Sequence, residues 1–198
     1  MNRNALLFVM VFSMGFIIMS VELLGGKILA PYFGSSIYVW GSIITAFMLA
    51  LSFGYALGGL YSKYSPSMQK FGIVFLLAAV LLWMVILGSD PLGDWVFERV
   101  EDPRSGSLLF CMLIFFIPTL VMGFASPYAV SLTTASKETS GLSAGFLYFI
   151  STLGSALGTL LTSFYFALYL ETNTIIKLCS LVLACLGIAA LLQHRMSR

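Results

Sequence analysis

The chain has 198 residues, of which 60% are hydrophobic and only 9% are charged, and its mean hydropathy is +1.01. These values lie far from those of soluble domains and indicate a protein that resides in a lipid bilayer. The formal net charge is only +2, and no run of Lys and Arg could follow a phosphate backbone, so we expect no nucleic-acid partner.

Six apolar segments are long enough to cross a membrane. A helix rises about 1.5 Å per residue, so about 20 apolar residues cross roughly 30 Å of hydrocarbon, and a helix satisfies its own backbone there. The sequence therefore predicts an all-α, polytopic membrane protein with one transmembrane domain over residues 1–198. The predicted helices cover residues 5–30, 37–60, 71–88, 107–130, 141–166 and 173–192.

The basic residues predict the orientation, because Lys and Arg concentrate in cytoplasmic loops. Six of them share one side and two lie on the other, so we expect both termini in the cytoplasm. The segment 89–106 then faces outward and carries five acidic residues around Trp95 and Phe97. It fits a solvated loop with a short amphipathic helix on the membrane, or a funnel that concentrates cations. The inner residues are Arg3, Lys63, Lys70, Lys137, Arg195 and Arg198, against Arg99 and Arg104 outside.

Two short motifs occur twice in the chain. Residues 30–35 read APYFGS and residues 126–131 read SPYAVS, at the ends of the first and fourth predicted helices. Residues 54–59 read GYALGG and residues 154–159 read GSALGT, in the second and fifth. The offsets, 96 and 100 residues, differ by four loop residues. Because each unit has three spans, the second copy must be inverted, as in many secondary transporters. The predicted repeats cover residues 5–88 and 107–192.

The second repeated motif places two glycines four residues apart on one helix face in each copy. Such a face lets a neighbouring backbone approach closely, which predicts helix packing at these positions. A surface that slides during alternating access needs the same small residues, so that role stays open. The glycines are Gly54, Gly58, Gly154 and Gly158.

The first helix exit suggests a family. Residues 22–36 read ELLGGKILAPYFGSS and residues 38–41 read YVWG, while the second half offers PTLVMG at 118–123 and GFLY at 145–148. This pattern resembles the membrane half of bacterial spermidine synthase-like fusion proteins, often labelled as fused transporter and spermidine synthase. The family often has Arg where Lys27 stands. The resemblance covers essentially the whole chain and implies the bacterial inner membrane.

In those fusion proteins a cytoplasmic Rossmann-like aminopropyltransferase domain follows the sixth helix. A nucleotide-cofactor domain needs about a hundred residues or more, and no extramembrane segment of this chain approaches that length. We therefore expect no enzymatic activity and no cofactor. The resemblance implies a soluble aminopropyltransferase-like partner on a separate polypeptide.

Polar side chains inside the predicted spans are the candidates for a polar pathway. Glu22 is the strongest, because a carboxyl about 12 Å deep is costly unless it is paired, neutral or hydrated. A structural hydrogen bond to a neighbouring helix would explain it equally well. Lys27 lies five residues on, at about 140° around the helix, so an ion pair between the two is not expected. The other candidates are Tyr55, Ser126, Tyr148, Ser151 and Thr152.

Prolines predict breaks in two of the helices. Pro118 and Pro127 leave helix carbonyls without donors, which bends a helix or exposes carbonyls to a cation. Pro31 falls at the exit of the first helix. The three cysteines show no metal-ligand spacing, so we expect no metal site. They are Cys111, Cys179 and Cys185.

Two functions compete at this point. The first is a transporter-like module for a small cation or polyamine-related solute, which the repeat, Glu22 and the acidic outer segment favour. The second is an anchor or scaffold for the soluble aminopropyltransferase-like protein or for a larger membrane complex. Six spans equal half of a typical twelve-helix transporter, so a transport path of that design needs a homodimer or a partner.

Overall fold

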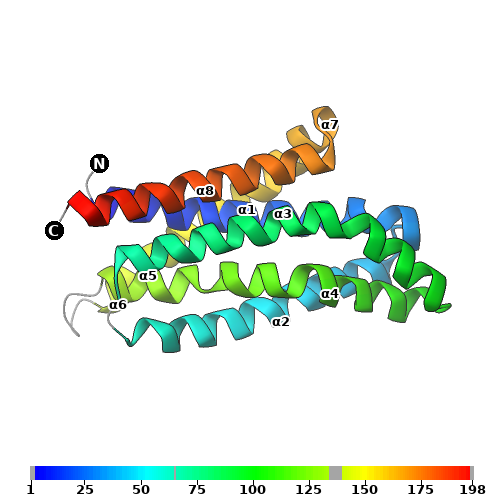
Figure 1. The fold of residues 1–198 in the computed structure, drawn as a ribbon, viewed down its shortest axis with the longest axis horizontal. Coiled ribbons are helices and arrows are strands. Elements are labelled where there is room, and N and C mark those ends of the chain that lie inside the picture. The colour runs from blue at the N-terminus through cyan, green and yellow to red at the C-terminus, as the bar shows by residue number, and fades with distance from the viewer. Residues whose placement is uncertain (1–2, 65, 134–139, 197–198) are drawn as a thin grey trace.

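The computed structural model describes residues 3–64, 66–133 and 140–196, and within them six helical spans are long and apolar enough to cross a membrane (Figure 1). The chain is therefore an all-helical, multi-pass membrane protein. The start of the first described helix and the end of the last one lie at the same end of the bundle, and the opposite end is called the distal end below. The elements are α1 (Arg3–Phe33), α2 (Ile37–Ser62), α3 (Met68–Arg99), α4 (Pro103–Gly123), α5 (Ala125–Thr133), α6 (Ser140–Leu161), the π-helical turn η1 (Thr162–Phe166), α7 (Ala167–Tyr169) and α8 (Thr172–Met196).

The third helix is much longer than the sequence predicted. The span predicted at 71–88 was expected to be the shortest, but α3 has 32 residues and continues through Pro91 to Arg99. The prediction of a loop over 89–106 is therefore wrong for most of that segment. Proline within a membrane helix is tolerated when neighbours satisfy the freed carbonyl, and Val96 beyond it is fully buried. Asp102 then caps the next helix by accepting a hydrogen bond from the Arg104 N–H (3.1 Å).

The fourth and fifth spans are interrupted, but only partly where prolines predicted it. Pro118 lies inside α4 without ending it. Pro31 lies in the last turn of α1, which ends at Phe33 and is followed by Gly34 with φ +74°. The break between α4 and α5 falls at Phe124, one residue after Gly123, whose carbonyl would have been the helical acceptor for the N–H that Pro127 lacks. The fifth span is interrupted by η1, which no sequence signal had indicated.

Two pairs of parallel helices are packed through glycines. In the first pair, α2 packs against α4. A Cβ added at Gly54 or Gly58 of α2 would stand closer than 3 Å to the backbone of Leu120 in α4 or of Phe124 directly after it. The second pair joins α6 to α1 in the same way, since a Cβ at Gly154 or Gly158 would meet the carbonyl oxygen of Phe12 or Phe16. Close approach of this kind requires glycine and fixes both pairs.

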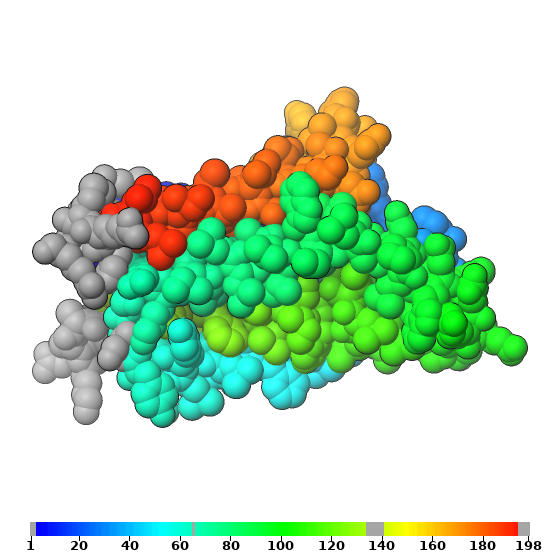
Figure 2. All heavy atoms as spheres, viewed as in Figure 1, coloured from blue at the N-terminus to red at the C-terminus, as the bar shows by residue number. Residues whose placement is uncertain are grey.

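The remaining spans close the bundle. Helix α3 packs along α8 and along α4, and Ser180 of α8 donates a hydrogen bond to the Ala79 carbonyl of α3 (2.8 Å). Near the termini the Tyr128 ring of α5 stacks on Phe71 of α3, with ring centroids 5.6 Å apart. Toward the distal end α7 and the start of α8 project from the rest of the surface (Figure 2).

Candidate functional site

A polar cavity of about 440 Å³ lies at the distal end of the bundle. It is called the distal cavity below. Its walls come from α1, from α3 and from the start of α8 with Glu171 before it, so three of the six spans meet there. It is lined by Lys27, Ile28, Pro31, Tyr32, Ser89, Asp90, Glu171, Thr172 and Asn173.

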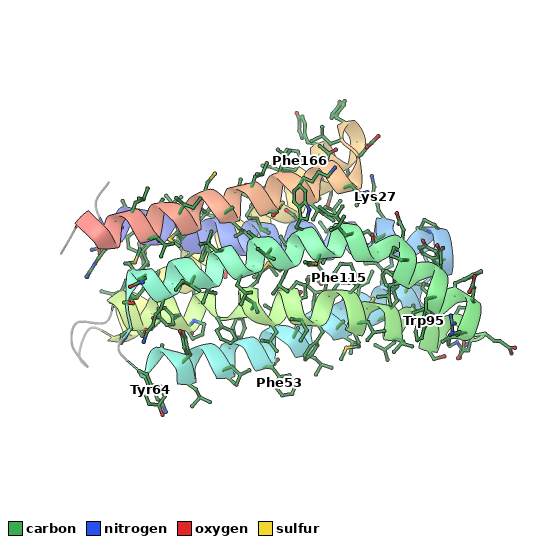
Figure 3. The ribbon with its side chains drawn as sticks, in the orientation of Figure 1. Lys27, Phe53, Tyr64, Trp95, Phe115 and Phe166 are labelled. Atoms are coloured by element: carbon green, nitrogen blue, oxygen red, sulfur yellow. The ribbon has the colours of Figure 1, made fainter. Side chains whose placement is uncertain are left out.

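Lys27 is held at the edge of this cavity by the fifth span. Its Nζ donates a hydrogen bond to the Ala167 carbonyl oxygen (2.5 Å), directly after η1. An ammonium at a helix C-terminus interacts favourably with the free carbonyls there. Lys27 and Phe166 accordingly lie at the same end of the bundle, beside the start of α8 (Figure 3). One N–H of Lys27 is used in this way, which leaves two donors for a ligand.

Asp90 is positioned by the continuation of α3 and by Tyr32. The Tyr32 hydroxyl donates to the Asp90 carbonyl oxygen (3.3 Å), and its ring lies against Gly93, where a Cβ would stand closer than 3 Å to the ring carbons. Ser89, which precedes Asp90, is buried. The site therefore depends on the helical conformation of a segment that the sequence had assigned to a loop.

The charges of the distal cavity favour a ligand with a cationic group. Two carboxylates, Asp90 and Glu171, line the cavity together with one ammonium, Lys27, and all three residues are exposed. The excess negative charge attracts a cation, while the ammonium supplies a site for a phosphate or carboxylate. No ion pair joins the described acidic side chains to Lys27, so these groups are available to a ligand.

An apolar cleft of about 270 Å³ lies beside α8, deeper in the spans than the distal cavity. Its walls come from α1, η1 and α8, and nearly all of its lining atoms are carbon. It is lined by Phe12, Ser13, Phe16, Ile17, Phe166, Leu170, Ile175, Leu178, Cys179 and Val182.

The polar pathway predicted from sequence is not gathered in one place. Glu22 is half-buried, and no hydrogen bond or ion pair joins its carboxyl to a described residue. Tyr55 of α2 and Tyr148 of α6 lie within electrostatic range of each other, and both side chains are exposed. Of the predicted residues, only Lys27 and Pro31 line the distal cavity.

The remaining predicted residues lie in helix contacts or on the surface. The Ser151 carbonyl oxygen lies against Gly15 of α1, whereas Thr152 is exposed. Ser126 is half-buried near the break between α4 and α5, and Pro127 packs against Gly58. These placements suit helix packing better than a continuous path.

The structure describes only some of the basic residues that the sequence places on the cytoplasmic side. Lys63 is exposed, while Lys70 donates to the Tyr64 carbonyl oxygen (2.6 Å) and lies over the Tyr61 ring. Lys137 and Arg198 lie outside the described residues, as does the side chain of Arg195. In the described part of the chain no three His, Cys, Asp or Glu side chains come together as metal ligands.

Sequence reasoning missed the two acidic residues that line the distal cavity together with Lys27. Asp90 was assigned to a solvated loop, and Glu171 was not considered. The available signal was topological: with six spans, the segment after the third helix and the segment between the fifth and sixth must share one end of the bundle. Comparison of the chain with protein-family models, with curated proteins and with solved structures found no match.

Proposed function

We propose that this protein is a transporter-like membrane module, built from two inverted three-helix repeats, that binds an amine-bearing solute at its distal end. The observation that carries the proposal is the distal cavity, which lies between elements of both repeats and has two carboxylates in its lining. Secondary transporters place their substrate sites at such repeat interfaces, beside broken helices. Here the broken element is η1, next to which Lys27 is held.

The glycine contacts support the inverted repeat. Phe12, Gly15 and Phe16 of α1 contact α6 as Leu120, Gly123 and Phe124 contact α2, which is a constant offset of 108 residues. On the partner helices, Ser151, Gly154 and Gly158 correspond to Leu51, Gly54 and Gly58, an offset of 100. The contacts thus favour the repeated glycine motif of the second and fifth spans. They do not favour the offset of 96 residues between the two proline-containing motifs at 30–35 and 126–131.

The two repeats differ in a way that alternating access requires. In the proposed repeat, α1 corresponds to α4–α5 and α8 corresponds to α3. The line of contact, or seam, between α1 and α8 therefore corresponds to the seam between α4–α5 and α3. The first seam contains the apolar cleft and, at its distal end, the distal cavity. The second contains the fully buried rings of Phe71, Phe75 and Tyr128. An inverted-repeat transporter that is open on one side has this asymmetry.

Binding and uptake of spermidine by the protein in lipid vesicles test the proposal. Because the carboxylates are solvent-exposed, each contributes about 1 kcal/mol to binding of a cation, so Asp90→Asn and Glu171→Gln should each weaken spermidine binding about five-fold. The matched control is Glu98→Gln with Glu101→Gln, which removes two exposed charges at the same end but outside the cavity. Equal losses in the control pair would show a general surface-charge effect and contradict the site.

A second function, an interaction module within the membrane, is favoured by the surfaces of α2 and α6. These are the two least buried and least apolar of the six spans. Each exposes small residues at matching positions, with Gly41, Ser52 and Ala56 corresponding to Gly141, Thr152 and Ala156. Small residues on a membrane helix face are typical of helix association. Two results together would favour this function: spermidine binding that is unchanged in Asp90→Asn and Glu171→Gln, and a protein partner that copurifies in stoichiometric amount in mild detergent.

A further inference from the structure

The apolar cleft and the distal cavity follow one side of α1. Phe16, Ser20 and Lys27 are spaced by four and seven residues, so their side chains leave the helix in nearly the same direction. Phe16 lines the cleft and Lys27 lines the cavity. Between these two residues, the buried Ser20 hydroxyl accepts a hydrogen bond from the Thr162 hydroxyl of η1 (2.8 Å), so Thr162 separates the two spaces along α1.

The opposite wall joins the two spaces more closely. Leu170 lines the cleft and the next residue, Glu171, lines the cavity. At the start of α8, Asn173 belongs to the cavity and Ile175 to the cleft, less than one helical turn apart. A polar and an apolar compartment thus adjoin along the seam between α1 and α8.

We propose that this seam binds one aminophospholipid, with its headgroup in the distal cavity and an acyl chain in the apolar cleft. The chemistry of each compartment matches one part of such a lipid. Lys27 meets the phosphate with its free N–H donors, and Asp90 and Glu171 meet the ammonium. The inference rests on the amine site proposed above and specifies that its ligand carries an acyl chain.

The size of the cleft agrees with part of a single chain. Its volume of about 270 Å³ is about nine times the 30 Å³ that one water molecule occupies in the liquid, so it has room for part of one acyl chain. The rest of the chain and any second chain remain in the bilayer. Water is disfavoured in the cleft, because its lining offers almost no hydrogen-bond partners.

The experiment is native mass spectrometry of the protein released from nanodiscs. The discs contain phosphatidylethanolamine and phosphatidylglycerol in equal amounts with identical chains, so that only the headgroup differs. We expect the wild type to retain one lipid and to prefer phosphatidylethanolamine at least three-fold. Phosphatidylglycerol is the matched comparison lipid, because its headgroup has the phosphate but lacks the ammonium.

The acyl-chain site is tested by filling the cleft. Cys179→Trp should reduce the retained lipid to the level of non-specific attachment, because the indole occupies the space of the chain. Cys185→Trp is the matched control, since Cys185 is an exposed residue of the same helix that does not line the cleft. Ser13→Phe fills the cleft from α1 and keeps the test valid if Cys179→Trp does not fold, as judged by circular dichroism.

The headgroup site is tested by the double variant Asp90→Asn with Glu171→Gln. It should still retain a lipid but lose the preference for phosphatidylethanolamine. Retention in both filled variants equal to wild type would overturn the lipid site while leaving the proposed amine binding intact. An unchanged lipid preference and unchanged spermidine binding in the double variant would instead overturn the proposed function. A lipid-free dimer as the main wild-type species would show that a second copy covers the seam, and would also overturn the inference.

Discussion

Under the proposed inverted repeat, the seam between α1 and α8 corresponds to the seam between α4–α5 and α3. The first contains an open cleft, whereas buried aromatic rings fill the second. Helices α1 and α4–α5 are held on their other sides by equivalent glycine contacts, with α6 and α2 respectively. Toward α3, the rings of Phe71 and Tyr128 fill the space, with Tyr128 fully buried. Toward α8, Phe12 and Phe16 of α1 instead line the apolar cleft.

This difference separates what is common to the two halves from what is particular to one. The glycine contacts are backbone approaches that no other residue type can make, so they define the shared framework. The filling of the seams depends on which large side chains stand on α3 and α8. The proposed binding site therefore lies in the part of the molecule where the two halves differ.

The largest effect is expected from breaking the shared framework. The double variant Gly154→Leu with Gly158→Leu places side chains where the carbonyl oxygens of Phe12 and Phe16 stand, and backbone cannot yield as a side chain can. Two overpacked sites cost about 2–6 kcal/mol, which is enough to prevent folding of a marginally stable protein. The measurement is the yield of monodisperse protein and its melting temperature in detergent.

The control for this prediction comes from the same helix. Gly141 and Gly145 are also four residues apart, but a Cβ at either position meets no atom within 4 Å. Gly141→Leu with Gly145→Leu should therefore change the melting temperature little. The corresponding pair Gly54→Leu with Gly58→Leu should be as damaging as the first variant. A mild effect there would mean that the two glycine-packed pairs are not equivalent.

A smaller effect is expected from opening the filled seam. Tyr128→Ala removes a fully buried ring that stacks on Phe71 and should cost about 2 kcal/mol or more. Tyr128→Phe keeps the ring and loses only the hydroxyl, which accepts a hydrogen bond from the Ser67 N–H (3.0 Å), at a cost of about 1 kcal/mol. Tyr148→Ala, at an exposed tyrosine, is the control. Equal melting temperatures for Tyr128→Ala and Tyr148→Ala would show that the ring does not hold this seam closed.

Sequence alone predicted the spans because hydrophobic length is a one-dimensional signal. All six predicted segments lie within helical spans of the structure, and the predicted starts at 37 and 173 agree with α2 and α8 to within one residue. The end of α3 was missed because a proline next to acidic residues is typical of a loop. Only burial of Val96 and the contact of Tyr32 with Gly93 show why the helix continues.

The candidate site was less predictable, because it depends on contacts between distant segments. Lys27 was a candidate because it is a polar side chain inside the first predicted span. Its acceptor, the Ala167 carbonyl, is 140 residues away and directly follows a π-helical turn without a sequence signature. Asp90 and Glu171 are ordinary exposed acids in the sequence. Their role follows only from the cavity in which the two segments meet.

The smallest effect on stability is expected at Glu22. This carboxyl lies two helical turns beyond Gly15, which faces α6, and one turn before Gly26, which faces Trp40 of α2. It is therefore on the side of α1 between α2 and α6, away from the open seam that contains Lys27. It has no partner among the described residues, so Glu22→Gln should change the free energy of unfolding by no more than about 0.5 kcal/mol.

An uptake assay tests whether the Glu22 carboxyl has a role in the proposed transport. A group that is costly to place in a membrane and contributes nothing to folding is expected to bind or carry a cation in the proposed transport. Glu22→Gln should then abolish spermidine uptake into vesicles while leaving equilibrium binding at the distal cavity unchanged, because the carboxyl does not line that cavity. A variant that melts well below the wild type would identify Glu22 as a structural link between helices. A stable variant with normal uptake would leave the carboxyl without a part in transport and restrict the functional region to the seam between α1 and α8.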